Sequence, residues 1–241
     1  MKKLIIIFIV AVTLIRCSSS DNNLSQNNSP TNSISLKVKK ITNGTSISNF
    51  EYVNGLVSKV INTTPSQNTS IFEYNYENGR IKQIYSYELT SSGSTVNPST
   101  IIYSYTGSKI TSDTNNDNGV NYSDSYIYNN DLLLNRKEFR SNGTINNNYD
   151  FEYFSDTNVK KETQTNTIVF VKNFSSYDTK FNYEKLIFTP ELQLIYRTPK
   201  NNLLISDNAT FEYEYNSQNY PTKITRKNNG IVSFVKVLEY Q

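Results

Sequence analysis

The sequence predicts an all-β protein built from consecutive hairpins, and three observations support this fold class. Short runs with aromatic residues at alternate positions recur along most of the 241 residues. Asn, Ser, Thr and Gly interrupt these runs at roughly every tenth position, as turn residues do between strands. No apolar pattern with the 3.6-residue period of a helix persists. We therefore expect a long antiparallel meander that forms a strongly curved sheet or a partly closed barrel.

The first segment, residues 1–16, has the plan of a signal peptide. Two lysines follow Met1, and an almost unbroken apolar run extends from Leu4 to Ile15. This run is shorter than the ~20 residues that a membrane-spanning helix needs. We therefore interpret residues 1–16 as an export signal and not as a permanent anchor.

The end of this segment resembles the lipobox of bacterial lipoproteins. Leu14 lies three residues before Cys17, the one cysteine of the chain, although Arg16 stands where the family has a small residue. The resemblance implies that Cys17 is diacylated, becomes the mature amino terminus and holds the protein to the outer membrane. The alternative is an ordinary secreted protein whose cysteine happens to fall at this position.

Residues 17–35 form the next predicted unit, a disordered tether. Ser and Asn dominate this stretch, and Pro30 interrupts it. Such a composition buries too little apolar surface to offset the entropy lost on ordering. A flexible polar spacer after a lipidated cysteine would let a folded domain sit away from the bilayer.

Residues 36–241 form one predicted β domain with a repeated hairpin. Segments 50–60 and 74–84 align without a gap, each with alternating aromatics, an Asn-Gly pair and alternating aliphatics. Asn-Gly between two such runs is a strong hairpin signal, because both residues tolerate positive φ. Loops of varied length separate the copies, for example 91–98 and 113–119. The last aromatic before each turn marks seven hairpins, or about fourteen strands, at Tyr52, Tyr76, Tyr105, Tyr128, Tyr153, Tyr183 and Tyr215.

Segments 74–81 and 211–224 carry a resemblance to a known family. Tyr-Asn-Tyr-Glu-Asn-Gly-Arg-Ile and Phe-Glu-Tyr-Glu-Tyr-Asn-Ser-Gln-Asn-Tyr-Pro-Thr-Lys-Ile are similar to the YD repeats of the RHS family and of uncharacterised envelope lipoproteins of Gram-negative, Bacteroidetes-like bacteria. The resemblance covers roughly residues 47–241. It implies stacked hairpins associated with enclosing shells and with carbohydrate binding, and no catalytic residue within the repeat.

The alternation predicts one aromatic and one charged face for each strand. In segments 72–76 and 211–215 the aromatics share one face, which we expect to be concave or internal. The other face carries acids before the turn and lysines after it, which would pair across strands. These residues are Glu51, Glu73, Glu152, Glu212 and Glu214, with Lys59, Lys82, Lys109, Lys160 and Lys223.

The composition excludes several chemistries. With no His and one Cys, the chain has no Cys/His zinc site, no Ser-His-Asp or Cys-His relay and no intrachain disulfide. A formal charge of +3, partly from the leader, indicates no nucleic-acid footprint. No carboxylate pair stands out as a glycosidase would require. We therefore predict a non-enzyme without metal or cofactor.

The predicted function is binding or structural presence in the cell envelope, with a glycan or another envelope protein as partner. Tyr85, Tyr87 and Tyr220 lie beyond the anchor positions and are the candidate ligand-binding residues, although core packing is the alternative for any such tyrosine. A second hypothesis is a periplasmic carrier or chaperone that shelters an apolar ligand in the curved sheet. A third is a secreted or transmembrane β-barrel. Whether the domain faces the periplasm or the exterior stays open.

Overall fold

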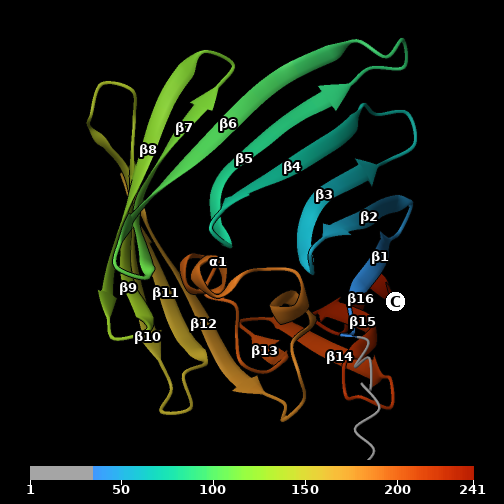
Figure 1. Ribbon diagram of the computed structural model, residues 1–241. Coiled ribbons are helices and arrows are strands. Elements are labelled where there is room, and N and C mark those ends of the chain that lie inside the picture. The colour runs from blue at the N-terminus through green and yellow to red at the C-terminus, as the bar shows by residue number, and fades with distance from the viewer. Residues whose placement is uncertain (1–34) are drawn as a thin grey trace, which may run out of the picture. The chain divides into compact units, whose positions relative to one another are not determined.

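In the computed structural model of the protein, residues 35–241 are described, and they form a closed barrel of sixteen antiparallel strands (Figure 1). The predicted signal peptide, Cys17 and the predicted tether up to residue 34 lie outside the described residues. The all-β meander is confirmed, because each strand pairs with its neighbours in sequence and β1 closes the barrel on β16. Within residues 35–241, no helix has the length and apolarity needed to span a bilayer.

The first eight strands are β1 (Val38–Asn43), β2 (Ser46–Val53), β3 (Leu56–Thr63), β4 (Thr69–Glu77), β5 (Arg80–Leu89), β6 (Thr95–Thr106), β7 (Lys109–Asp117) and β8 (Val120–Asn129). The second eight are β9 (Leu132–Phe139), β10 (Ile145–Tyr153), β11 (Val159–Thr165), β12 (Val169–Tyr177), β13 (Leu203–Ser206), β14 (Ala209–Tyr215), β15 (Pro221–Asn228) and β16 (Ile231–Tyr240). This is two strands more than the seven predicted hairpins supply.

Asn-Gly turns form the hairpins as expected. Asn78 and Gly79 both have positive φ, 52° and 77°, the combination that a two-residue hairpin turn requires. The predicted loop 113–119 is wrong, because β7 continues to Asp117 and only Asn118 and Gly119 turn. The hydrogen-bond ladders to β6 and β8 hold this polar segment as strand, which its own residues do not favour.

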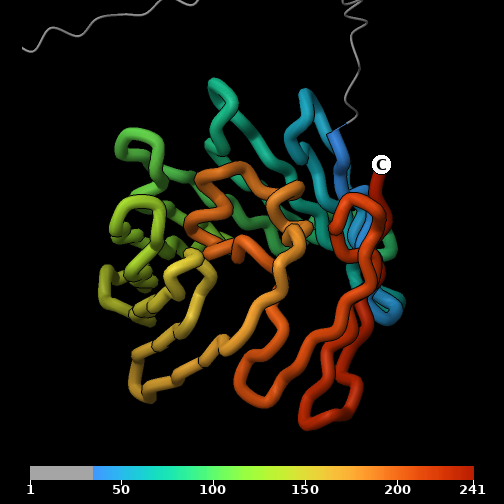
Figure 2. Tube along the Cα trace, turned by 90° about the horizontal axis from the view of Figure 1, so that it is seen from below, coloured from blue at the N-terminus to red at the C-terminus, as the bar shows by residue number. Residues whose placement is uncertain are grey.

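The segment between β12 and β13, residues 178–202, lies inside the barrel, and we call it the plug. It contains the short helices η1 (Tyr183–Leu186) and α1 (Pro190–Ile195), and both Figures 1 and 2 show it within the ring of strands. Leu192 and Ile195 of α1 pack among core side chains of β5, β6, β8 and β9. Tyr183 and Ile187 pack among those of β1, β3, β15 and β16. The plug therefore fills the lumen at one end.

The prediction of Tyr183 as a hairpin anchor is wrong. Tyr183 starts η1, where the Asn182 side chain caps the helix by accepting a hydrogen bond from the backbone N–H of Glu184 at 2.9 Å. The plug is short, and each of its helices is only one or two turns long. Such elements show no 3.6-residue periodicity in the sequence, so the pattern of aromatics predicted a strand there.

Eight tyrosine hydroxyls, which we call the tyrosine clamps, donate hydrogen bonds at the end of the barrel that holds the plug. Each lies near the end of an even-numbered strand and donates to the backbone carbonyl of the first or second residue of the preceding strand, at 2.5–2.9 Å. The donors are Tyr52, Tyr76, Tyr105, Tyr128, Tyr153, Tyr177, Tyr213 and Tyr240. We call this end the plug rim and the opposite end the far rim.

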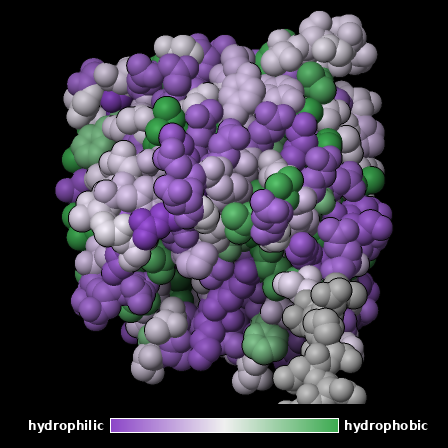
Figure 3. Space-filling model, in the orientation of Figure 1, coloured by the Kyte–Doolittle hydropathy of each residue, from purple (hydrophilic) through white to green (hydrophobic). Residues whose placement is uncertain are grey.

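The outer face of the barrel carries the predicted charged residues. Lys59 pairs with Glu73 at 3.0 Å, and Lys223 pairs with Glu214 at 2.8 Å. Glu152 pairs with Lys161 at 2.9 Å instead of with Lys160. Hydrophilic side chains also predominate on the face of the molecule shown in Figure 3. Aromatic residues of the same strands point inward and join the core clusters, as the alternation predicted.

Candidate functional site

A polar cavity of about 270 Å³ lies in the lumen between α1 and the inner faces of β6–β10. The plug residues Ile195 and Tyr196 line it on one side. Asn115, Tyr122 and Asn146, which lie on the strand halves nearest the far rim, also line it. The cavity is therefore accessible from the far rim, whereas the plug closes it toward the plug rim.

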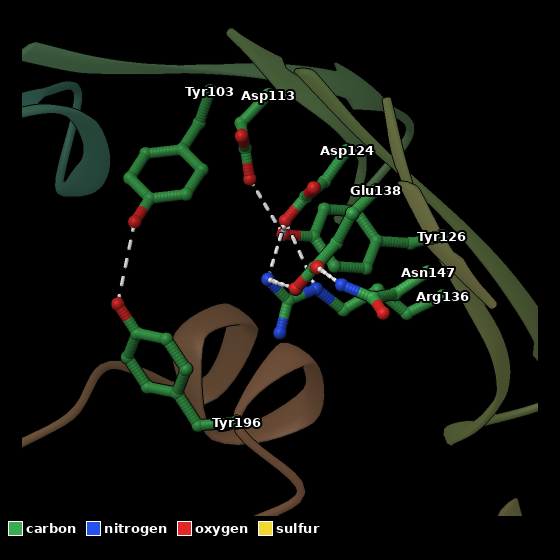
Figure 4. A network of polar contacts seen from close by, with 8 residues as sticks. All are labelled: Tyr103, Asp113, Asp124, Tyr126, Arg136, Glu138, Asn147 and Tyr196. Atoms are coloured by element: carbon green, nitrogen blue, oxygen red, sulfur yellow. Dashed lines mark hydrogen bonds and ion pairs between the residues drawn. The ribbon is translucent and has the colours of Figure 1, made fainter. Parts of the chain in front are cut away.

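Arg136 on β9 is the centre of a hydrogen-bonded network in this cavity (Figure 4). Its Nη2 lies 2.7 Å from Asp124 Oδ2 and 2.7 Å from Glu138 Oε1. Asn147 Nδ2 donates to Glu138 at 2.6 Å, and the Tyr126 hydroxyl donates to Asp113 Oδ2 at 2.5 Å. Four neighbouring strands, β7 to β10, supply these groups, and the pleat directs all of them into the lumen.

Burial controls the electrostatics of the network. It raises the pKa of Asp113 to about 6, against the hydrogen bond from Tyr126, which lowers it. Burial also raises the pKa of Asp124, and Arg136 opposes that shift. Burial alone would lower the pKa of Arg136, but Asp124, Tyr126 and Glu138 together raise it. Three carboxyl groups therefore face one guanidinium, so the cavity disfavours an anionic ligand near neutral pH.

Aromatic rings complete the wall of the polar cavity. The hydroxyls of Tyr103 and Tyr196 lie 3.3 Å apart, which links β6 to the plug. Tyr196 also packs edge-on against Phe188, with ring centroids 4.8 Å apart. Tyr122 on β8 is 41% exposed and lines the cavity. The site thus combines ring faces with charged and amide groups in one concave surface, the composition of a small-molecule site.

The three tyrosines predicted to bind ligand do not line this cavity. Tyr85 and Tyr87 lie on the outer face of β5, because Tyr85 pairs with the outward Glu73 and the Tyr87 hydroxyl donates to Glu73 at 3.3 Å. Tyr220 lies at the plug rim against Phe181 and Tyr240, with ring centroids 5.2 and 6.2 Å apart. Half-buried rings in these positions pack against neighbours.

Sequence reasoning missed the charged residues of the site. Asp113 was expected at the start of a loop, and Asp124, Arg136 and Glu138 were not singled out. One signal could have found them: Asp124 is two residues before the inward Tyr126, so the period of two places its side chain in the lumen. A charged side chain is stable at this inward position only if the lumen contains water.

A second, wider groove of about 930 Å³ lies on the plug rim between the plug and the part of the barrel from β5 to β10. Several cations line it, but most of them have partners in the barrel. Arg197 pairs with Glu162 at 2.6 Å, and Arg80 donates to the Gly107 carbonyl at 2.8 Å. Lys109 pairs with Asp131 at 3.2 Å. Across residues 35–241, no group of three or more His, Cys, Asp or Glu residues is arranged to hold a metal ion.

No protein-family model matches the chain, and no curated protein matches it in sequence. Among solved structures, a porin-like protein from Bacteroides uniformis is similar to this chain at 13% identity and a TM-score of 0.44, over 85% of this chain and 97% of that one. A porin-like protein from Bacteroides vulgatus is similar at 12% identity and a TM-score of 0.41, over 86% of this chain and 99% of that one.

Proposed function

We propose that the protein is a non-catalytic binding barrel of the cell envelope that holds a neutral or amino glycan in its polar lumen cavity. The observation that carries this proposal is the cavity wall, where Tyr103, Tyr122 and Tyr126 stand beside Asp124, Arg136 and other polar groups. The mouths of β-barrels are frequent ligand sites. The plug supports the proposal because it converts a through-channel into a closed-ended cup.

The chemistry of the wall suits a hydroxyl-rich ligand. Carboxylates accept hydrogen bonds from sugar hydroxyls, while Arg136 and the amides of Asn115 and Asn146 donate to them. The rings of Tyr122 and Tyr126 offer apolar faces to the C–H side of a sugar. The network preorganises these groups before the ligand arrives, which lowers the entropic cost of binding.

The envelope location and the lipid anchor are further parts of the proposal. Acylation at Cys17 would tether the chain, and mass spectrometry of the amino-terminal peptide from the membrane fraction tests this. A peptide that starts at acylated Cys17 and disappears in Cys17→Ala supports the anchor, and a soluble, non-acylated form contradicts it. The barrel itself starts at the plug rim, where Lys37 N–H donates to the Gln241 carbonyl at 3.0 Å.

The carboxyl groups support binding better than catalysis. Asp113, Asp124 and Glu138 each hold a hydrogen bond or ion pair from Tyr126, Arg136 or Asn147. A pair of acids for glycoside cleavage must flank the scissile bond from opposite sides, whereas these three carboxyl groups lie together in one network beside Arg136 (Figure 4). We expect bound oligosaccharide to be recovered uncleaved, and chromatography of the mixture after long incubation checks this.

Saturation-transfer NMR and calorimetry with neutral, amino and acidic mono- and disaccharides test the glycan proposal. We expect the neutral or amino sugars to bind and the acidic ones to fail, because three carboxyl groups face the cavity. Tyr122→Ala should weaken binding about tenfold, equivalent to ~1.4 kcal/mol of lost ring contact. The matched control is Tyr87→Ala, which removes an outer-face tyrosine and should leave binding unchanged. Binding that is lost only in Tyr87→Ala, or an absence of sugar binding, would contradict the proposal.

A further inference from the structure

A second cavity of about 300 Å³ shares the lumen with the polar one and lies over η1, against the inner faces of β1–β4. Its wall is mainly apolar and includes Ile41, Phe50, Val60, Phe72, Ile187 and Phe188. Phe50, Phe72 and Phe188 are only partly buried, although they pack against the core cluster. Apolar surface is therefore left uncovered inside the barrel, and the apolar part of a ligand would be stabilised by covering it.

One aromatic pair separates this apolar cavity from the polar one. Phe188 lines the apolar cavity, and Tyr196 lines the polar cavity. Their ring centroids are 4.8 Å apart. Tyr196 is 41% exposed, so a single molecule with a polar head and an apolar tail can lie across this pair and reach both cavities.

Two polar groups in the apolar wall restrict what the tail can be. The Asn62 Oδ1 atom is buried and accepts no hydrogen bond, so it lacks the donor that buried acceptors normally have. Glu184 lines the same cavity, and burial raises its pKa, with Lys236 opposing the shift. A hydroxyl or amide N–H on the ligand would donate a hydrogen bond to Asn62 Oδ1, whereas a carboxylate on the ligand would be repelled by the Glu184 carboxyl group. A free fatty acid is accordingly a poor fit.

We infer that the ligand is a glycolipid-like amphiphile whose sugar head lies in the polar cavity and whose alkyl or acyl chain lies in the cavity over η1. This inference rests on the proposed glycan-binding function and adds the second half of the ligand. A cavity of about 300 Å³ has room for roughly ten groups of the size of a water molecule, at ~30 Å³ each. A chain of medium length therefore fills the cavity, while its head reaches the neighbouring network around Arg136.

Isothermal titration with methyl, butyl and octyl β-D-glucoside, each below its micellar concentration, tests the inference. Full burial of one methylene strengthens binding roughly fourfold, so we expect the octyl glucoside to bind at least about tenfold more tightly than the methyl glucoside. Equal affinity for the methyl and octyl compounds would overturn the inference and leave the glycan proposal standing. Binding of the octyl compound that does not depend on the sugar would support the tail cavity and overturn the glycan proposal. Absence of binding by all three would overturn both.

A cavity-filling variant locates the chain. Ser48 lines the apolar cavity, so Ser48→Phe should abolish the gain from the octyl chain while methyl-glucoside binding persists. The matched control is Ser104→Phe, since Ser104 is exposed and lies between the inward-facing Tyr103 and Tyr105. A chain-length gain that survives Ser48→Phe would overturn the inference.

The absence of tryptophan from the chain allows a direct measurement. Phe72→Trp would place one indole in the cavity wall, and Tyr85→Trp would place one on the outer face of the neighbouring strand. We expect an alkyl glucoside with a brominated chain to quench the indole fluorescence of the Phe72→Trp variant and to leave that of the Tyr85→Trp variant unquenched. Equal quenching of both would indicate adsorption to the surface and would overturn the inference.

Discussion

At the residue scale, the recurrence of tyrosine is explained by the tyrosine clamps. A phenylalanine would bury the same ring, but only the phenol hydroxyl can reach the carbonyl at the start of the neighbouring strand. Tyr153, for example, donates to the Leu133 carbonyl at 2.7 Å, and burial raises the pKa of Tyr153 to about 12. The clamps tie paired strands together where hairpin pairing ends, so each hairpin carries its own copy.

Tyr153→Phe should lower the free energy of unfolding by about 1–2 kcal/mol, because a buried carbonyl loses its donor while the ring stays. Tyr122→Phe is the matched control, since Tyr122 is 41% exposed at the cavity, and its change should stay within about 0.5 kcal/mol. Urea unfolding measures both. A loss as large in Tyr122→Phe as in Tyr153→Phe would contradict the role of the clamps.

Ionisation of Asp113 makes the stability of the barrel fall as the pH rises. Its side chain is buried, and its pKa rises to about 6 in the folded state. Between the unfolded value near 4 and pH 6 the folded state binds more protons than the unfolded state, so stability falls as the pH rises through this window. Above pH 6 the buried Asp113 carboxyl is ionised, and the loss of stability is complete.

Asp113→Asn should therefore be more stable than the unmodified protein at pH 7, by up to about 2–3 kcal/mol, and should match it near pH 4. The amide oxygen can still accept the hydrogen bond from Tyr126. Asp117→Asn, at an exposed position of the same strand, should show no such pH-dependent difference. Unfolding at a series of pH values measures the difference, and a gain that is equal at pH 4 and pH 7 would refute the assignment.

At the element scale, the plug determines whether the barrel is an open channel or is closed at one end. A sixteen-stranded barrel without a plug has a lumen wide enough for an aqueous channel. Here α1 and η1 cover one end, and Glu191 of α1 accepts a hydrogen bond from the backbone N–H of Ile81 at 3.1 Å. Asn202, at the end of the plug, donates to the carboxylate of Asp178 at its start, at 3.1 Å. The plug is thus hydrogen-bonded to β5, and a further hydrogen bond joins its own two ends.

Leu192→Ala should cost about 2–5 kcal/mol of stability, since Leu192 is 1% exposed and packs in the core cluster of β5–β10. Leu194→Ala, two residues further on the same helix, removes a half-buried side chain that lines the groove on the plug rim and should cost less than about 1.5 kcal/mol. Thermal unfolding measures both changes. Equal losses would show that α1 does not pack through Leu192.

At the scale of the whole molecule, the ion pairs of the outer face predict a barrel surrounded by water. Cross-strand ion pairs such as Lys59–Glu73 and Lys227–Glu212 lie on the outward positions of their strands, at 3.0 and 2.5 Å. A barrel that spans a bilayer carries an apolar band at these positions, because a charge at mid-depth costs ~2–4 kcal/mol. Exposed pairs of this kind add little stability, but they favour a wet surface over a lipid one.

Residues 35–241, produced without the preceding segment, should therefore stay monodisperse in buffer without detergent. They should also fail to float with phosphatidylcholine vesicles. Size-exclusion chromatography and vesicle flotation measure these two properties. A requirement for detergent, or insertion into vesicles, would show that the strands face lipid.

The sequence predicted the local features well because their causes are local. Asn78-Gly79 forms its turn through the conformational preferences of two residues, and Phe72 and Tyr74 point inward through the pleat alone. The charged outer face follows from the same alternation, so Glu73 and Lys59 were predicted on the correct side. The prediction failed at Tyr183 and at 113–119, where contacts from distant strands override weak local preferences.

By itself, then, the sequence determined the all-β class, the antiparallel meander and the outward side of the strands that carry the Glu–Lys pairs. The tertiary structure alone decided that β1 closes on β16, that residues 178–202 enter the lumen, and that Asp113, Asp124 and Arg136 meet there. The physical reason is the range of the interactions. Turn and pleat preferences act within a few residues, whereas closure, plugging and the shared burial of charges join residues that are far apart in the chain.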